Sequence, residues 1–116
     1  MGQKEKSTEK ARKVRVLNSA FQDIEDISDF IAIANQQPLN AIKVVETIWQ
    51  TITKIEQNPF AFRECEQIPT KTKIYRRAVC LSWLIVYKIT ANEIIILGVI
   101  HSARNPIRIQ GIKKNK

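Results

Sequence analysis

The sequence contains few of the residues on which common catalytic and metal-binding motifs depend. Glycine occurs three times in 116 residues and is never clustered, so the chain has no glycine-rich phosphate-binding loop. His101 is the single histidine, and no nucleophile elbow accompanies it, so a serine–histidine–aspartate relay is not indicated. Cys65 and Cys80 are too few for a disulfide scaffold and lack the paired spacing of zinc ligands. We therefore expect reduced thiols, no metal site and no cofactor.

Long apolar segments are also missing. The longest uninterrupted apolar run, Ile94 to Ile100, is far shorter than the roughly 20 residues that cross a bilayer as a helix. The N-terminus is charged, and the apolar segment of a secretory signal does not follow it. The sequence therefore predicts a cytoplasmic protein without a membrane partner, and its length predicts one domain.

Positive charge is concentrated at the two ends of the chain. The formal net charge is +8, with five basic and two acidic residues in 1–13, and five basic residues and no acidic one in 104–116. The neutral segment between them separates four acidic residues in 23–29 from four basic residues in 71–77. A basic end beside a basic strand favours an anionic partner such as nucleic acid. The alternative is that the charged ends keep the protein soluble.

The first half of the chain predicts a strand and a helix after a disordered basic leader, residues 1–13. Residues 14–17 alternate in polarity as a short strand does. Asn18 and Ser19 are good N-cap residues for the helix that follows. Its apolar stripe consists of Ala20, Ile24, Ile27, Ile31 and Ala34, and is widened by Phe21 and Phe30.

A second helix is predicted to begin with Pro38 in its first turn and to end at Asn58-Pro59. Trp49 lies at the edge of its apolar stripe, which consists of Ala41, Val44, Val45, Ile48, Ile52 and Ile55. The connection between the two helices is short, so they should be antiparallel neighbours that cover a common surface.

Three strands are predicted after a loop over residues 60–73, near 74–79, 82–90 and 93–101, with turns near 80–81 and 91–92. The last strand is apolar on both faces, which predicts a central position in the sheet. The strand at 14–17 must then pair beside a later strand. We expect an α+β fold in which an antiparallel two-helix hairpin covers a small, mainly antiparallel sheet. Residues 14–108 would form the domain and 109–116 a basic tail.

The candidates for chemistry are cations and one phenol at strand positions. Side chains alternate along a strand, so Tyr75 and Arg77 should share one face of the sheet and Arg76 the other. A two-residue turn at 91–92 places Tyr87 opposite Ile96 and His101 opposite Ser82. Tyr87 and His101 then point to opposite faces, although a shift of one residue would reverse this.

Each of these candidates also has a purely structural interpretation. Tyr87 can be a core aromatic residue with its hydroxyl at the edge, and His101 a structural donor at the end of a strand. Arg76 and Arg77 can be an edge-strand pair that discourages aggregation. Packing explains Arg104 least, because it follows the last strand where the chain turns at Asn105-Pro106.

Six segments occur in a characteristic order: Ala20–Ile24, Ile55–Pro59, Tyr75–Arg77, Leu84–Ile89, Ile94–Ile100 and the His101-x-x-Arg104 turn. Together they resemble the RelE/ParE superfamily of plasmid-stabilisation toxins from type II toxin–antitoxin modules. The resemblance covers about residues 14–108 and implies a growth-arresting toxin that a small antitoxin neutralises. The antitoxin is expected on the helical hairpin at Trp49 and on an uncapped, basic edge of the sheet.

The resemblance leaves two mechanisms open. RelE-like members cut messenger RNA on the ribosome, and here Arg76, Arg77, Tyr87, His101 and Arg104 would supply the charge stabilisation and proton transfer. ParE-like members poison DNA gyrase and need no nuclease site, and the His-x-x-Arg ending resembles their side of the superfamily. No tyrosine follows Tyr87, although many nuclease members have a further tyrosine or histidine near the C-terminus.

An alternative from a different class is a non-toxic module that binds nucleic acid through the same basic surface. Its candidate contacts are Lys71, Lys73, Arg76, Arg77, Arg104 and Arg108.

Overall fold

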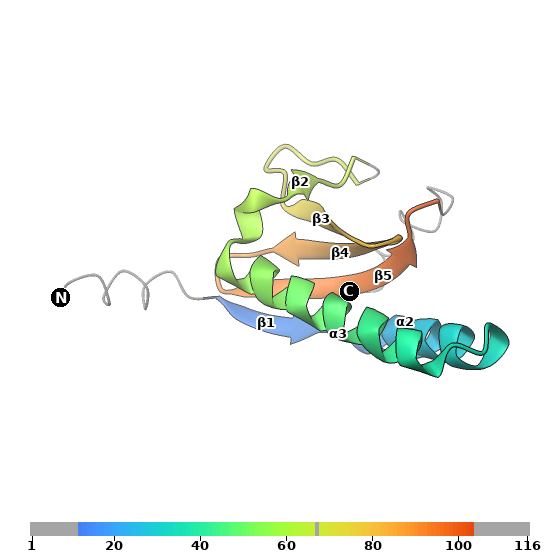
Figure 1. Ribbon diagram of the computed structural model, residues 1–116. Helices are drawn as coiled ribbons and strands as arrows, with labels where there is room; N and C mark the ends of the chain where they lie inside the picture. Colours follow the sequence, from blue (N-terminus) through green and yellow to red (C-terminus); the bar gives the residue numbers. More distant parts are fainter. Residues whose placement is uncertain (1–11, 67, 104–116) are drawn as a thin grey trace.

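The computed structural model describes residues 12–66 and 68–103, which form two helices packed on one face of a five-stranded sheet (Figure 1). The elements are β1 (Lys13–Val16), α2 (Asn18–Asp29), the π-helix η1 (Phe30–Ala34), α3 (Pro38–Gln57), the 3-10 helix η2 (Pro59–Ala61), β2 (Arg63–Glu64), β3 (Tyr75–Cys80), β4 (Trp83–Ile89) and β5 (Glu93–His101). The predicted α+β fold is confirmed. No helix within the described ranges is both long and apolar enough to cross a membrane.

The strands are arranged in the order β1-β5-β4-β3-β2. β5 pairs in parallel with β1 and antiparallel with β4, so it lies in the interior of the sheet, as its two apolar faces predicted. All seven residues from Ile94 to Ile100 are buried. The strand order also explains why β5, the last of the described strands, does not lie at an edge.

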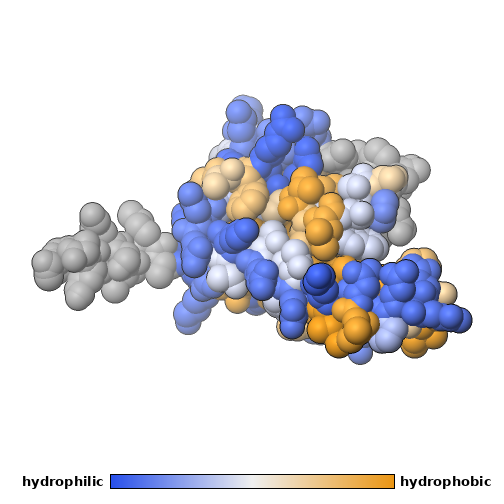
Figure 2. Space-filling model, viewed as in Figure 1, coloured by the Kyte–Doolittle hydropathy of each residue, from blue (hydrophilic) through white to orange (hydrophobic). Residues whose placement is uncertain are grey.

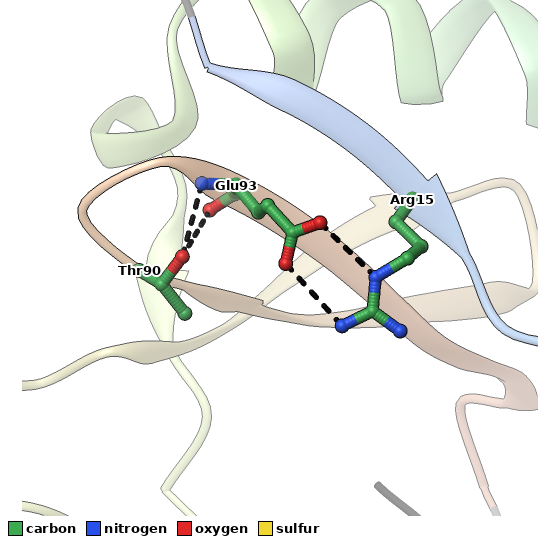
Figure 3. Close-up of polar contacts among 3 residues, drawn as sticks. All are labelled: Arg15, Thr90 and Glu93. Carbon is green, nitrogen blue, oxygen red and sulfur yellow. Dashed lines mark hydrogen bonds and ion pairs between the residues drawn. The ribbon is translucent and has the colours of Figure 1, made fainter.

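Polar side chains from β1 and from the turn after β4 reinforce the pairing at the start of β5 (Figure 3). The Arg15 guanidinium donates to both carboxylate oxygens of Glu93, at 3.1 and 3.3 Å. The Thr90 hydroxyl accepts a hydrogen bond from the Glu93 N–H at 2.9 Å, which closes the turn between β4 and β5. The ion pair is exposed, so we expect it to help fix the register of β1 against β5 and to add little to the stability of the fold.

Side chains at the start of α2 form hydrogen bonds with backbone groups of β5 beyond the point where β1 ends. The Ser19 hydroxyl donates to the Leu97 carbonyl at 3.1 Å, and the Asp23 carboxylate accepts from the Val99 N–H at 3.0 Å. The predicted N-cap at Asn18 or Ser19 is wrong, because Leu17 occupies the cap position and no side chain caps the helix. Ser19 is committed to the sheet and does not bond its own helix.

The sheet separates two apolar clusters. The larger one lies under the helices and comprises the buried stripes of α2 and α3 together with Ala78, Cys80, Ile85, Tyr87, Ile89, Ile94, Ile96 and Val99. The smaller one lies on the other face and comprises Cys65, Ile68, Tyr75, Leu84, Val86, Ile95, Leu97 and Ile100. Tyr75 and Arg76 therefore face opposite sides of the sheet, as alternation predicted.

The helical hairpin extends beyond the end of the sheet and exposes apolar side chains there (Figures 1 and 2). Phe30 is 58% exposed and Phe21 is 49% exposed, so the prediction that both widen the buried stripe is wrong. For Phe30 the reason is that α2 gives way at this residue to the π-helix η1, which departs from the α-helical spacing on which the prediction depended. Phe21 lies on the regular part of α2 and packs against Trp49 at the surface.

A β-bulge changes the predicted register of β5. Tyr87 lies opposite Ile96 as predicted, but Val86 lies opposite Gly98, so one extra residue of β5 is accommodated between them. As a result His101 lies opposite Trp83, not Ser82. The expectation that Tyr87 and His101 point to opposite faces is therefore wrong, because the extra residue inverts the alternation and places both on the helix side.

The loop predicted over 60–73 contains two short elements that its sequence did not indicate, η2 and β2. β2 pairs with only two residues of β3, Arg76 and Arg77. Among the described residues, Ala78 to Cys80 therefore have no neighbouring strand on that side, and this is the open sheet edge. β3 continues to Cys80, so the turn lies at 81–82, one residue later than predicted, and Leu81 adopts a positive φ of 58°.

Candidate functional site

Arg76 and Tyr87, directly opposite each other on β3 and β4, hold the turn that follows α3. The Arg76 guanidinium donates to the carbonyls of Phe60 at 3.2 Å and Phe62 at 2.7 Å, and through Nε to that of Lys73 at 3.0 Å. The Tyr87 hydroxyl donates to the Pro59 carbonyl at 2.6 Å. Two of the five predicted catalytic side chains thus bind backbone carbonyls of one short segment.

Tyr87 is fully buried, and its ring packs edge-on against Phe62 at 6.4 Å. Burial raises the pKa of the phenol well above its ordinary value of 10.0, and the nearby positive charge of Arg76 only partly opposes this. At neutral pH the hydroxyl is therefore protonated and engaged with a carbonyl. These conditions suit a structural donor and do not suit a group that exchanges protons with a substrate.

Two arginine side chains gather at the ring of Phe60, a residue that the sequence pattern did not single out. The guanidinium of Arg12 lies 5.4 Å from the Phe60 ring centroid, and that of Arg76 lies 5.2 Å from the same centroid. Arg12 is held by a hydrogen bond from Nε to the Thr90 carbonyl at 2.8 Å. Phe60 is 51% exposed, so this cationic cluster is accessible from solvent.

His101 lies at the far end of β5, against Trp83, whose ring centroid is 5.1 Å away with the two rings nearly perpendicular. Its Nδ1 accepts a hydrogen bond from the Ala103 N–H at 3.1 Å. Trp83 and Tyr87 are four positions apart on β4, a separation of roughly 13 Å along a strand. His101 and Tyr87 therefore share a face of the sheet but do not form one reaction centre.

The other predicted site residues are dispersed. Arg77 points to the face opposite Arg76 and lies between Arg63 on β2 and Val86 on β4. Lys71 and Lys73 are exposed in the loop before β3. Arg104 and Arg108 lie outside the described residues. Among the residues that are described, the predicted nuclease set is divided between the two faces and two ends of the sheet.

A groove runs between the helical hairpin and the end of the sheet at which His101 lies. Two adjoining hollows form it, and they share Phe30, Trp83 and His101. The first, of about 420 Å³, is also lined by Asp23, Asp26, Ile27, Val99 and Ile100. We call these two hollows the hairpin–sheet groove.

Trp49 lies outside this groove, on the outer face of the hairpin. It is half-buried, and its ring lies 5.6 Å from that of Phe21 on α2. The two rings border a shallow hollow together with Glu25. The prediction that Trp49 lies at the edge of the apolar stripe is confirmed, and the hollow gives a partner side chain a place to pack.

No group of three or more histidine, cysteine, aspartate or glutamate side chains able to hold a metal ion occurs in 12–66 and 68–103. Cys65 and Cys80 are buried on opposite faces of the sheet and form no disulfide with each other.

Residues 14–106 match the family model described as "ParE toxin of type II toxin-antitoxin system, parDE". The chain belongs to this family. It is thus the toxin component of a type II toxin–antitoxin system, in the RelE/ParE superfamily that the six sequence segments indicated. No curated protein matches the chain in sequence.

Solved structures share the fold of this ParE-family chain at low sequence identity. A chain of the chromosomal ParDE toxin–antitoxin system from P. aeruginosa is 17% identical, with a TM-score of 0.62 over 78% of this chain and 96% of that one. A mutant of the E. coli toxin RelE in the free state is 10% identical, with a TM-score of 0.58 over 90% and 97%. The toxin–antitoxin complex RelBE2 from Mycobacterium tuberculosis contains a chain that is 17% identical, with a TM-score of 0.51 over 78% and 98%.

Proposed function

We propose that this ParE-family toxin arrests growth by poisoning DNA gyrase and that it does not cut messenger RNA. The observation that carries the proposal is the state of Tyr87, the phenol that a nuclease mechanism could use for proton transfer. It is fully buried and donates at 2.6 Å to the Pro59 carbonyl. A gyrase poison needs no proton-transfer group, so the same residue is free to serve the fold.

The dispersal of the cations supports the same conclusion. Arg76 binds three backbone carbonyls, and Arg77 points to the other face of the sheet. His101 lies on the same face of the sheet as Arg76, the face that the helices cover, but at the other end of the strands. Phosphodiester cleavage requires charge stabilisation and proton transfer around one reacting phosphate. The family match adds to this, because the matched family is named for ParE.

The second candidate is ribosome-dependent cleavage of messenger RNA. It is favoured by a hollow whose lining includes Arg63, Lys73 and Arg76 along with Glu64 and Glu66. Arg76 also lies over the exposed ring of Phe60, and a cation next to an aromatic ring suits an RNA strand. In that case the ribosome would supply groups that the toxin lacks.

Purified enzymes separate the two mechanisms. The toxin should inhibit supercoiling by gyrase and leave broken DNA, while messages in a translating extract stay intact. Cleaved messages with unaffected gyrase would reverse the assignment. Harmless expression in the native host, without the antitoxin gene, would favour the non-toxic nucleic-acid-binding module.

We further propose that the cognate antitoxin adds an extended segment to the open edge of β3 at 78–80 and packs against Trp49 on the hairpin. Val79 on that edge is 63% exposed, and the basic residues Arg63 and Arg77 adjoin it. An acidic antitoxin segment would complement these charges. Co-purification with the product of the neighbouring gene, followed by washes of increasing salt, tests this placement.

A further inference from the structure

The hairpin–sheet groove is the place where the irregular parts of the backbone meet. The π-helix η1 begins at Phe30, which lines both hollows of the groove. Leu81, at a positive φ of 58°, lines one of them, and a bulky residue in that region is costly. The bulge in β5 turns Val99 and His101 toward the helices. π-Helices and β-bulges are frequent at functional sites.

The lining of the groove has the composition of a protein-binding site. Its interior is formed by Ile27, Val99 and the half-buried Trp83, and Phe30 stands at its rim with 58% of its surface exposed. Aromatic side chains in a partly desolvated hollow are the usual anchors of protein interfaces. A partner that presents a bulky apolar side chain would remove Phe30 and Trp83 from water.

The charge of the groove determines what kind of partner fits. Two acidic residues lie on its wall: Asp23, whose carboxylate accepts a hydrogen bond from the Val99 N–H, and the exposed Asp26. No lysine or arginine occurs between residues 18 and 42. The cations of the described residues gather elsewhere, notably around Phe60 and in β3. An acidic groove repels the phosphates of a nucleic acid and attracts lysine or arginine. A polypeptide segment with a basic residue beside an apolar one would complement this lining.

We infer that the toxin binds gyrase through this groove, and that the groove receives a segment of gyrase with basic and apolar side chains. The inference rests on the proposed function. Charge separates the two partners: an acidic antitoxin segment suits the basic edge of β3, whereas an enzyme that handles DNA presents lysine and arginine to its substrate. The acidic groove matches such a surface and lies apart from Trp49.

The test uses the full-length toxin and purified gyrase, with two substitutions in the groove. Phe30→Ala removes the exposed anchor, and Asp26→Lys reverses the charge of an exposed wall residue. Each should raise the toxin concentration for half-maximal inhibition of supercoiling at least tenfold. Leu39→Ala, which removes another exposed apolar side chain, and Glu56→Lys, which makes the same charge change at an exposed position of α3 outside the groove and the Trp49 hollow, should alter it less than threefold.

Antitoxin binding and thermal unfolding are measured on the same four variants. Loss of inhibition by Phe30→Ala and Asp26→Lys, with antitoxin binding and folding retained, supports the inference. Undiminished inhibition by both overturns it, and so does loss of antitoxin binding in these two variants alone, which would assign the groove to the antitoxin. A wild-type toxin that leaves gyrase unaffected refutes the proposed function itself, and with it this occupant of the groove.

Discussion

Replacing Tyr87 with phenylalanine removes one hydroxyl group and leaves the ring in place. That hydroxyl lies 2.6 Å from the Pro59 carbonyl, and both residues are buried. The ring contact with Phe62 should survive the substitution, because it involves no polar atom of Tyr87. Tyr87→Phe therefore tests the hydrogen bond from Tyr87 on β4 to the turn after α3, with little other change.

The expected cost follows from the buried position of the acceptor. A buried carbonyl that loses a strong donor without access to water costs about 1–3 kcal/mol in free energy of unfolding. Tyr87→Leu should cost more, because it also removes part of a fully buried ring and leaves a cavity. The order of stability should be wild type, Tyr87→Phe, Tyr87→Leu.

The same bond predicts a dependence on pH. The pKa of Tyr87 is raised by burial above 10.0, its ordinary value. A raised pKa means that the folded state favours the protonated phenol, so this contribution to stability is complete below pH 10 and is lost as the pH rises toward the folded-state pKa. The stability advantage of wild type over Tyr87→Phe should therefore shrink above about pH 10.

Urea unfolding followed by circular dichroism, at pH 7 and at several values above pH 9, measures these differences. Growth arrest on induction is measured in parallel at a temperature at which Tyr87→Phe remains folded, and we expect arrest to persist. Unchanged stability together with lost toxicity would refute the reasoning, because it would make the phenol a functional group and not a structural one.

Three further substitutions test other parts of the structure. Arg76→Lys cannot reproduce the hydrogen bonds of the guanidinium to three carbonyls and should lower the free energy of unfolding by about 1–3 kcal/mol in urea titrations; an unchanged value would show that the turn is held otherwise. Asp23→Ala leaves the Val99 N–H without its acceptor and should cost about 1–3 kcal/mol, with faster hydrogen exchange at that amide as the diagnostic reading. Trp49→Ala should speed dissociation of the antitoxin at least tenfold in surface-binding kinetics while association changes little, and equal dissociation rates would place the antitoxin elsewhere.

The sequence was informative where one residue's environment depends on its near neighbours. The two apolar faces of Ile94 to Ile100 predicted an interior strand, and this in turn required β1 to lie beside it. The spacing of apolar residues in the helices predicted which side packs on the sheet. These features follow from local periodicity and from the need to cover apolar surface.

The errors concern features that depend on contacts between distant segments. The bulge in β5 exists because two strands adjust to each other, so counting from the turn placed His101 on the wrong face. Ser19 has the composition of an N-cap, but its hydroxyl binds the Leu97 carbonyl 78 residues away. The candidate site depends on contacts of the same kind: the sequence supplies cations and a phenol, but the tertiary fold sets the directions in which Arg76, Arg77 and Tyr87 point.

The parallel pairing of β1 with β5 affects the order in which the protein can form. The first strand made by the ribosome finds its partner only when the last strand has been made, because β1 binds β5 and nothing else in the sheet. Until then the two helices have no complete surface to cover, and long-range pairing of this kind is slow. A message cut short anywhere before β5 should therefore yield a chain that cannot fold, so that incomplete synthesis of the toxin is harmless to the cell.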